Sequence, residues 1–134
     1  MPARIPWKEL FEAASAARAR AYAPYSDFQV GAALLTEDGT IFAGGNVENA
    51  SYGLSICAER NAISRAVLEG HQQVRAVAIV VDTDTPTPPC GMCRQTMAEF
   101  AAPGMEVRSR NLEGKELRTT LEKLLPHAFT RAFF

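Results

Sequence analysis

Hydrophobic positions recur with two spacings along the chain, and each spacing predicts a type of element. Over Trp7–Tyr22, apolar residues return every three or four positions among good helix formers, which predicts an amphipathic helix that ends before Pro24. The same spacing returns over Cys57–Gly70 and Cys90–Ala102. The sequence therefore predicts these three helices, together with a short last helix over Leu121–Leu125.

Strands are predicted where shorter apolar runs stand between turn residues. Phe28–Leu35 and Ile41–Asn46 flank a turn at Asp38-Gly39, which is typical of a β-hairpin. Val74–Val81 is almost continuously apolar and rich in Val, as expected of a central strand covered on both faces. Two further short strands are expected, Met105–Arg108 and Lys115–Thr119.

The order of these elements predicts the fold class. Strands alternate with helices, so we expect an α/β protein, a three-layer α/β/α sandwich around one mixed five-stranded sheet. The chain has 134 residues, which is a common size for one domain and buries roughly two-thirds of the unfolded surface. No repeat or linker-like composition divides the sequence. Residues 1–134 are therefore expected to form a single domain.

Composition and charge exclude several classes of protein. Hydrophobic residues make up 47% of the chain and charged residues 22%, which argues against disorder. With 14 basic and 15 acidic residues the net charge is −1, so nothing in the charge balance attracts nucleic acid or an anionic membrane. No apolar run reaches the ~20 residues of a membrane span, and no secretory signal opens the sequence. We expect a cytoplasmic protein with neither nucleic acid nor membrane as its partner.

Three cysteines give the first indication of chemistry. Their odd number argues against a disulfide framework and leaves free thiols, buried hydrophobes or metal ligands. Cys90 and Cys93 are one helical turn apart, Cys57 opens another predicted helix, and a crossover connection would bring the two helix starts together. Three soft ligands favour zinc, and the lack of a suitably spaced fourth ligand leaves a position for water. Glu59, two residues after Cys57, could carry the proton of that water.

The chain resembles the small cytidine deaminases of pyrimidine salvage over nearly its whole length. The Cys-x-Glu and Pro-Cys-x-x-Cys elements are the signature of zinc deaminases, with Cys in place of the first His. The resemblance implies an α/β/α domain, usually a homotetramer, that hydrolyses cytidine and 2′-deoxycytidine to uridine and 2′-deoxyuridine with release of ammonia. The matching segments are Tyr25-Ser-x-Phe28-x-Val30-Gly31-Ala32-Ala33, Asn46-Val-Glu48-Asn49-Ala-Ser-Tyr52, Cys57-Ala-Glu59-Arg60, Pro89-Cys90-Gly-x-Cys93-Arg94-Gln95 and Leu125-Pro126-x-Ala-Phe129.

The resemblance also implies which residues carry out the reaction. Cys57, Cys90 and Cys93 would hold one zinc ion per chain. Glu59 would be the catalytic proton carrier, and the main-chain N–H of Ala58 would hold the carbonyl group of the base.

Further residues would bind the nucleoside. By the same resemblance, Phe28 would pack on the base, while Asn46 and Glu48 would bind the 3′-hydroxyl of the ribose. Tyr52 and Phe129 match positions that approach the active site of a neighbouring subunit. The resemblance therefore implies a homo-oligomer with composite sites and a small nucleoside as the substrate.

Two residues beside the ligands complete the expected site. Three thiolates and Zn²⁺ sum to a charge of −1, which weakens the metal as a Lewis acid. Arg60 lies three residues after Cys57, and its guanidinium would donate to the ligand sulfurs and withdraw charge from them. Pro88 stands where relatives often carry a small or polar residue, but its carbonyl group remains available to the amino group of the base.

Other interpretations stay open at this point. The cysteines could be buried thiols or hold a structural zinc, although the missing fourth ligand counts against the latter. The same chemistry could act on a related aminopyrimidine such as blasticidin S, although Asn46-x-Glu48-Asn49 favours plain nucleosides. An editing deaminase of tRNA or DNA needs a basic surface, and a non-catalytic zinc module has no use for Glu59. His71 and His127 are assigned no catalytic role.

Overall fold

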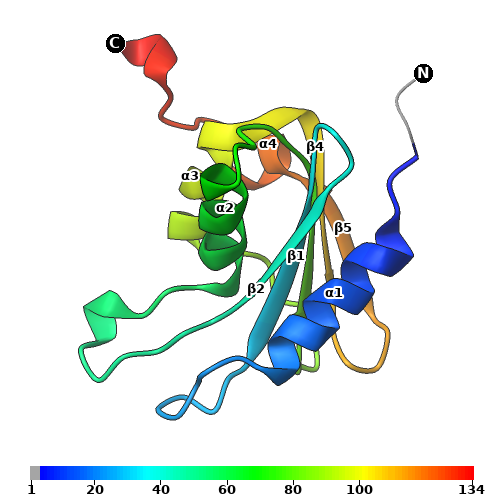
Figure 1. Ribbon diagram of the computed structural model, residues 1–134, viewed down its shortest axis with the longest axis vertical. Coiled ribbons are helices and arrows are strands. Elements are labelled where there is room, and N and C mark those ends of the chain that lie inside the picture. The colour runs from blue at the N-terminus through cyan, green and yellow to red at the C-terminus, as the bar shows by residue number, and fades with distance from the viewer. Residues whose placement is uncertain (1–3) are drawn as a thin grey trace.

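One mixed sheet organises the chain, with its strands in the order β2-β1-β3-β4-β5 (Figure 1). The computed structural model describes residues 4–134. β3 and β4 run parallel, whereas each other neighbouring pair is antiparallel, so the expected mixed five-stranded sheet is confirmed. The strands are β1 (Val30–Thr36), β2 (Ile41–Gly45), β3 (Val74–Val81), β4 (Ala101–Arg110) and β5 (Glu116–Thr120).

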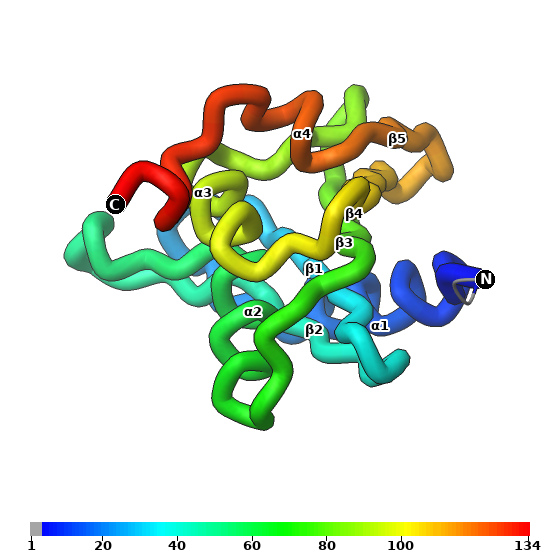
Figure 2. Tube along the Cα trace, turned by 90° about the horizontal axis from the view of Figure 1, so that it is seen from above, coloured from blue at the N-terminus to red at the C-terminus, as the bar shows by residue number. Residues whose placement is uncertain are grey.

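Helices cover both faces of the sheet, as Figures 1 and 2 show. On one face, α1 (Trp7–Ala19) buries Leu10, Phe11 and Ala14 against β1 and β3. A second hydrophobic core lies on the opposite face, between the sheet and the remaining helices. The predicted three-layer sandwich is therefore confirmed. These remaining helices are α2 (Ala58–Leu68), α3 (Gly91–Phe100) and the short α4 (Leu121–Leu124). The chain also forms two 3₁₀ turns, which are η1 (Tyr52–Leu54) and η2 (Arg131–Phe133).

Two element boundaries differ from the sequence-based expectation by three residues or more. α1 ends at Ala19 because Tyr22 leaves the helix to pair with the segment after β2, where its N–H donates to the carbonyl of Asn46. The strand expected to begin at Met105 already begins at Ala101, so β4 runs through Pro103-Gly104. A shift in the pairing register with β3 accommodates these residues, and Gly104 has the positive φ of 74° that glycine tolerates.

Glycines let two helices approach the sheet closely. A Cβ atom at Gly44 in β2 would lie 2.7 Å from the main-chain nitrogen of Ala62 and 2.8 Å from the carbonyl oxygen of Ala58, both in α2. A Cβ atom at Gly31 in β1 would overlap the carbonyl oxygen of Ala14 in α1. Any side chain at these positions would push a helix outward, so the two glycines set the depth at which α1 and α2 lie.

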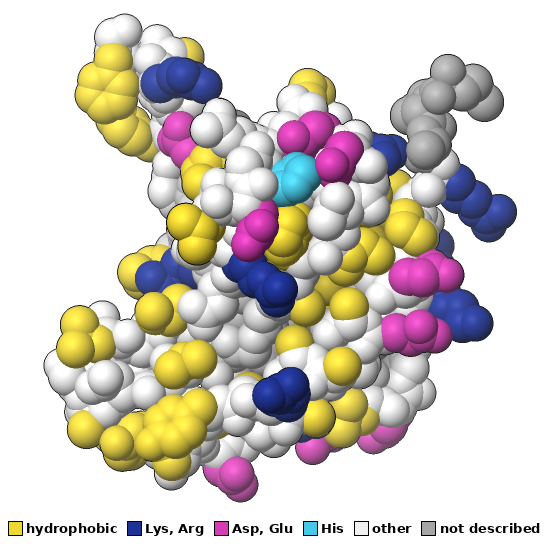
Figure 3. Space-filling view, viewed as in Figure 1, with side chains coloured by type: hydrophobic (Ala, Val, Ile, Leu, Met, Phe, Trp, Pro, Cys, Tyr) yellow, Lys and Arg dark blue, Asp and Glu magenta, His cyan; other side chains and the backbone are white. Residues whose placement is uncertain are grey.

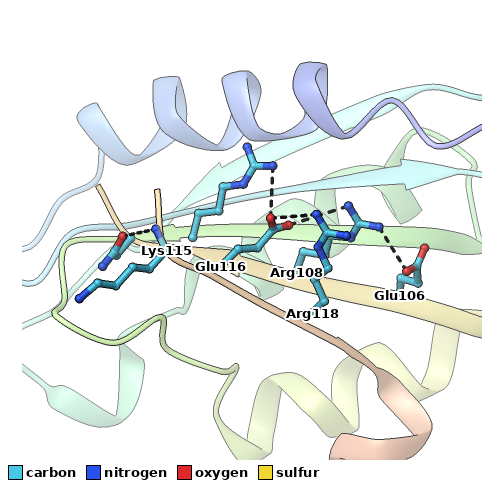
Figure 4. A network of polar contacts seen from close by, with 7 residues as sticks. Glu106, Arg108, Lys115, Glu116 and Arg118 are labelled. Carbon is cyan, nitrogen blue, oxygen red and sulfur yellow. Dashed lines mark hydrogen bonds and ion pairs between the residues drawn. The ribbon is translucent and has the colours of Figure 1, made fainter. Parts of the chain in front are cut away.

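Charged side chains of β4 and β5 connect the sheet to α1 (Figure 4). The largely buried carboxylate of Glu116 lies 3.9 Å from the guanidinium of Arg108 and 3.5 Å from that of Arg110. Arg108 also lies 4.1 Å from the ring centre of Trp7, and Arg110 lies 3.8 Å from that of Phe11. Such cation–π contacts contribute about 0.5–2 kcal/mol each. This network stabilises the face of the sheet opposite α2 and α3.

Candidate metal centre and substrate cavity

Three cysteine sulfurs meet where two helices begin. Cys57 and Cys90 immediately precede α2 and α3 in extended conformations, and Cys93 lies in the first turn of α3. The Sγ atoms of Cys57 and Cys90 are 3.8 Å apart, those of Cys90 and Cys93 are 3.4 Å apart, and all three lie within 4.8 Å of one another. A tetrahedral zinc ion with zinc–sulfur bonds of about 2.3 Å holds its ligands roughly 3.8 Å apart. The donor set and its spacing therefore fit zinc.

The charges around the sulfurs favour a bound cation. Hydrogen bonding to the Cys93 thiol, helped by the Arg60 guanidinium, lowers the pKa of Cys57 to about 5. The same interaction with Cys57, together with burial, raises the pKa of Cys93. One thiolate thus opposes ionisation of its neighbour because like charges repel at this distance. A bound divalent cation would remove that repulsion and allow all three thiols to ionise.

The guanidinium of Arg60 lies beside the sulfur of Cys57. Its Nη2 atom is 4.0 Å from Sγ of Cys57 and donates a hydrogen bond to the carbonyl of Ser55 at 3.1 Å. The second bond fixes the guanidinium in place, so the positive charge stays next to the sulfur.

Glu59 lies in the first turn of α2 and is only 6% exposed. Burial, followed by the negative charge of Cys57, raises the pKa of its carboxyl group above the ordinary value. The side chain lines the same cavity as Cys57 and Cys90. A carboxyl group that holds its proton more firmly than usual, beside a metal centre, is suited to accepting and returning protons.

A cavity of about 350 Å³ opens beside the sulfurs. This volume lies in the range of small-molecule sites. Its lining combines an apolar part, which suits a planar ring, with polar groups that suit a hydroxylated substituent. The apolar part includes Phe28, Ile79 and Val81, and the polar part includes Ser26, Asn46 and Glu48.

Asn46 and Glu48 are both hydrogen-bonded to the segment that leads into β1. Asn46 accepts from the N–H of Val30 and donates to the carbonyl of Phe28, each at 2.8 Å. Glu48 accepts from the N–H and the hydroxyl group of Ser26, and chiefly this hydroxyl lowers the pKa of the carboxyl. Sequence reasoning assigned no role to Ser26, although it lies inside the motif that contains Phe28.

Two predicted substrate contacts lie outside the cavity of their own chain. Tyr52 is 76% exposed, with its ring 6.2 Å from that of Tyr25. Phe129 is 60% exposed and stacks on Phe133 at 5.8 Å. In Figure 1 the C-terminal segment lies at the upper left and the loop with η1 at the lower left, apart along the long axis, and Figure 3 shows hydrophobic side chains on both. A single chain therefore does not bring Tyr52 and Phe129 together.

Among residues 4–134, no helix combines the length and the apolar character that crossing a bilayer requires.

Three comparisons relate the chain to known proteins. A family model described as the cytidine and deoxycytidylate deaminase zinc-binding region matches residues 6–109. A cytidine deaminase of Halalkalibacterium halodurans is 53% identical over 121 residues, which cover 90% of this chain and 92% of the relative. One of Sporosarcina psychrophila is 49% identical over 124 residues, 92% of this chain and 91% of the relative. The crystal structure of a cytidine deaminase from Burkholderia pseudomallei matches with a TM-score of 0.89 and 50% identity, over 93% of this chain and 100% of that one.

Proposed function

This chain belongs to the cytidine and deoxycytidylate deaminase family, and we propose from its cavity how it deaminates cytidine and 2′-deoxycytidine. The reaction is a hydrolysis that uses zinc and yields uridine or 2′-deoxyuridine with ammonia. The observation that carries the assignment is that a buried carboxyl group and two of the three clustered thiols, those of Cys57 and Cys90, line one cavity of nucleoside-base size. Nothing among the relatives favours blasticidin S as the substrate.

Glu59 moves the protons of the reaction. Cys57, Cys90 and Cys93 would hold the zinc ion, which when bound would supply an activated water near neutral pH. The Glu59 carboxylate accepts the first proton of this water and donates it to ring atom N3 while the oxygen bonds to C4. It then transfers the second proton to the exocyclic amino group, which leaves as ammonia as the C4 carbonyl forms. One carboxyl group with a raised pKa serves both transfers.

Main-chain and aromatic groups orient the base. The first hydrogen bond inside α2 runs from the N–H of Asn61 to the carbonyl of Cys57, so the N–H of Ala58 has no partner within the helix. We assign this N–H to the carbonyl oxygen of the base. Phe28 packs on the ring, and the Asn46 side chain holds the backbone on both sides of this contact.

Arg60 balances the charge of the ligands. The three thiolates outweigh Zn²⁺ by one negative charge, and the guanidinium beside Cys57 withdraws part of it. Its role is to keep the zinc electrophilic and not to contact the substrate.

The sugar-binding assignment predicts a ranking of substrate analogues. Because Glu48 and Asn46 are assigned to the 3′-hydroxyl, cytidine and 2′-deoxycytidine should have comparable kcat/KM, whereas 3′-deoxycytidine should be about 10–100-fold poorer. Ultraviolet absorbance measures turnover of these nucleosides, CMP and blasticidin S in parallel. A Glu48→Gln variant is the matched control and should lose the discrimination. Equal turnover of 3′-deoxycytidine would contradict the sugar assignment, and no turnover of cytidine would contradict the proposed function.

The proposal extends to the organisation of the protein. Residues 1–134 act as one domain, supported by the single sheet that carries both hydrophobic cores. The protein works in the cytoplasm in pyrimidine salvage, a localisation that its three free thiols support.

The proposed assembly is a closed homotetramer in which Tyr52 and Phe129 complete the sites of neighbouring subunits. The exposure of both aromatic residues supports this assembly, because soluble monomers seldom expose large apolar patches.

Composite sites predict that activity depends on assembly. Dilution below the dissociation constant of the oligomer should lower specific activity. Phe129→Ala should raise KM, and its co-expression with Glu59→Gln should restore sites that combine Glu59 of one subunit with Phe129 of another. Sedimentation and activity are measured on the same samples. A fully active monomer would contradict the proposed assembly.

A further inference from the structure

The loop between β3 and α3 forms one wall of the cavity and ends at a ligand. Thr87 and Pro88 line the cavity, and Cys90 follows two residues later. Prolines at positions 86, 88 and 89 have no N–H to donate. Within the described part of the chain, residues 4–134, no backbone-to-backbone hydrogen bond involves residues 83–88. Side chains must therefore hold this loop in its shape.

Asn111, at the end of β4, connects the loop to the β4–β5 turn. The residue is 4% exposed, and its Nδ2 donates to the carbonyls of Thr83 at 3.0 Å and Asp84 at 3.1 Å. Its Oδ1 accepts from the N–H groups of Glu113 at 3.1 Å and Lys115 at 2.9 Å, and Figure 4 shows the bond at Lys115. One buried amide thus uses both donors and both acceptor positions to join two segments.

The connection continues from Thr83 to the cavity. The Thr83 hydroxyl donates to the carbonyl of Thr85 at 2.5 Å and lies 3.2 Å from the hydroxyl of Thr87. Since Thr83 has a single hydroxyl proton, Thr87 must be the donor of the second bond. Asn111, Thr83 and Thr87 therefore form a continuous series of hydrogen-bonded residues that ends in the cavity wall.

We infer that Asn111 is a positioning residue for deamination, which holds the Thr87–Pro88 wall against the substrate without touching it. The inference rests on the function proposed for the cavity. The other end of the loop is held separately, because Nε of Arg94 donates to the carbonyl of Pro89 at 2.8 Å. Loss of the Asn111 connection therefore moves the wall while the ligand Cys90 stays in place.

The test uses a variant that cuts only this connection. Asn111→Asp keeps the oxygen that the β4–β5 turn needs but turns a second oxygen toward two carbonyls. We expect KM for cytidine to rise about tenfold or more, with kcat changed less and one zinc ion per chain retained. Gly114→Ala is the matched control: its φ of 89° makes alanine strained there, so it disturbs the same turn without cutting the connection. It should lower Tm and leave KM unchanged.

Several results would overturn the inference. These are an unchanged KM in Asn111→Asp, a KM increase that only follows zinc loss, or the same KM increase in Gly114→Ala at equal loss of Tm. If Asn111→Asp does not fold, Thr83→Val cuts the series nearer the cavity and should raise KM in the same way. Limited proteolysis within residues 82–90 should be faster in Asn111→Asp than in Gly114→Ala. That readout needs no turnover, so a native protein inactive on cytidine would contradict the proposed function alone.

Discussion

Glu59→Gln is expected to lower kcat for cytidine by more than about 10⁴-fold while one zinc ion per chain remains bound. General acid–base catalysis commonly contributes about 10²–10⁴-fold, and this carboxyl group serves two proton transfers. Glutamine has nearly the same size, so it fits the buried site, but it accepts no proton. Steady-state kinetics and metal analysis of the same preparation measure both effects.

The matched control for this variant is Glu69→Gln, which also removes one negative charge. Glu69 is exposed and caps the C-terminal end of α2, far from the cavity. This control variant should deaminate cytidine at the native rate. Near-native turnover of Glu59→Gln would contradict the assignment of Glu59 as the proton carrier. Loss of zinc together with activity would instead show that Glu59 supports the geometry of the ligands.

Cys90→Ser is expected to lose zinc and activity together. Cys90 precedes α3 at the capping position, where serine is among the most favourable residues, so the helix start is preserved while the soft ligand is lost. Zinc affinity should fall by more than the about 10–100-fold loss that is typical when a residue supporting a ligand is mutated. Tm should also fall, because zinc bound to the folded state stabilises it.

Metal titration, kinetics and thermal unfolding measure these changes. Met92→Ser is the control, since Met92 is 64% exposed in the same helical turn and is absent from the sulfur cluster. It should retain zinc and activity. A Cys90→Ser protein with native zinc content and native kcat would rule out Cys90 as a ligand.

Local periodicity predicted the core of the fold but not its irregular parts. Val74–Val81 was expected as a central strand and is one, because a strand paired on both sides and covered by helices needs a continuous apolar run. The Pro103-Gly104 pair carries a strong turn signal, yet pairing of β4 with β3 overrides it through a register shift. Likewise α1 ends early because Tyr22 finds a partner in the segment after β2.

The candidate site likewise contains residues that the sequence could bring together and residues that it could not. The three cysteines could be placed together because helical spacing and the crossover connection dictate where the helix starts lie. The contacts of Ser26, Thr87 and Asn111 could not be predicted from the sequence, because they join loops of irregular conformation. The bond from Asn111 to Thr83 spans 28 positions, and that from Ser26 to Glu48 spans 22, with no repeating pattern to mark either pair.

The close approach of α2 to Gly44 has a consequence for how this scaffold can evolve. A larger residue there would displace the first turn of α2, and with it Cys57 and Glu59, so a change of substrate cannot begin beneath the helix without loss of the chemistry. Ser26, Thr87 and Pro88 line the cavity from loops, where a larger side chain would extend into the cavity and not into a helix backbone. A change of substrate is therefore expected to arise from substitutions in these loops, while Gly44 beneath the first turn of α2 must remain glycine.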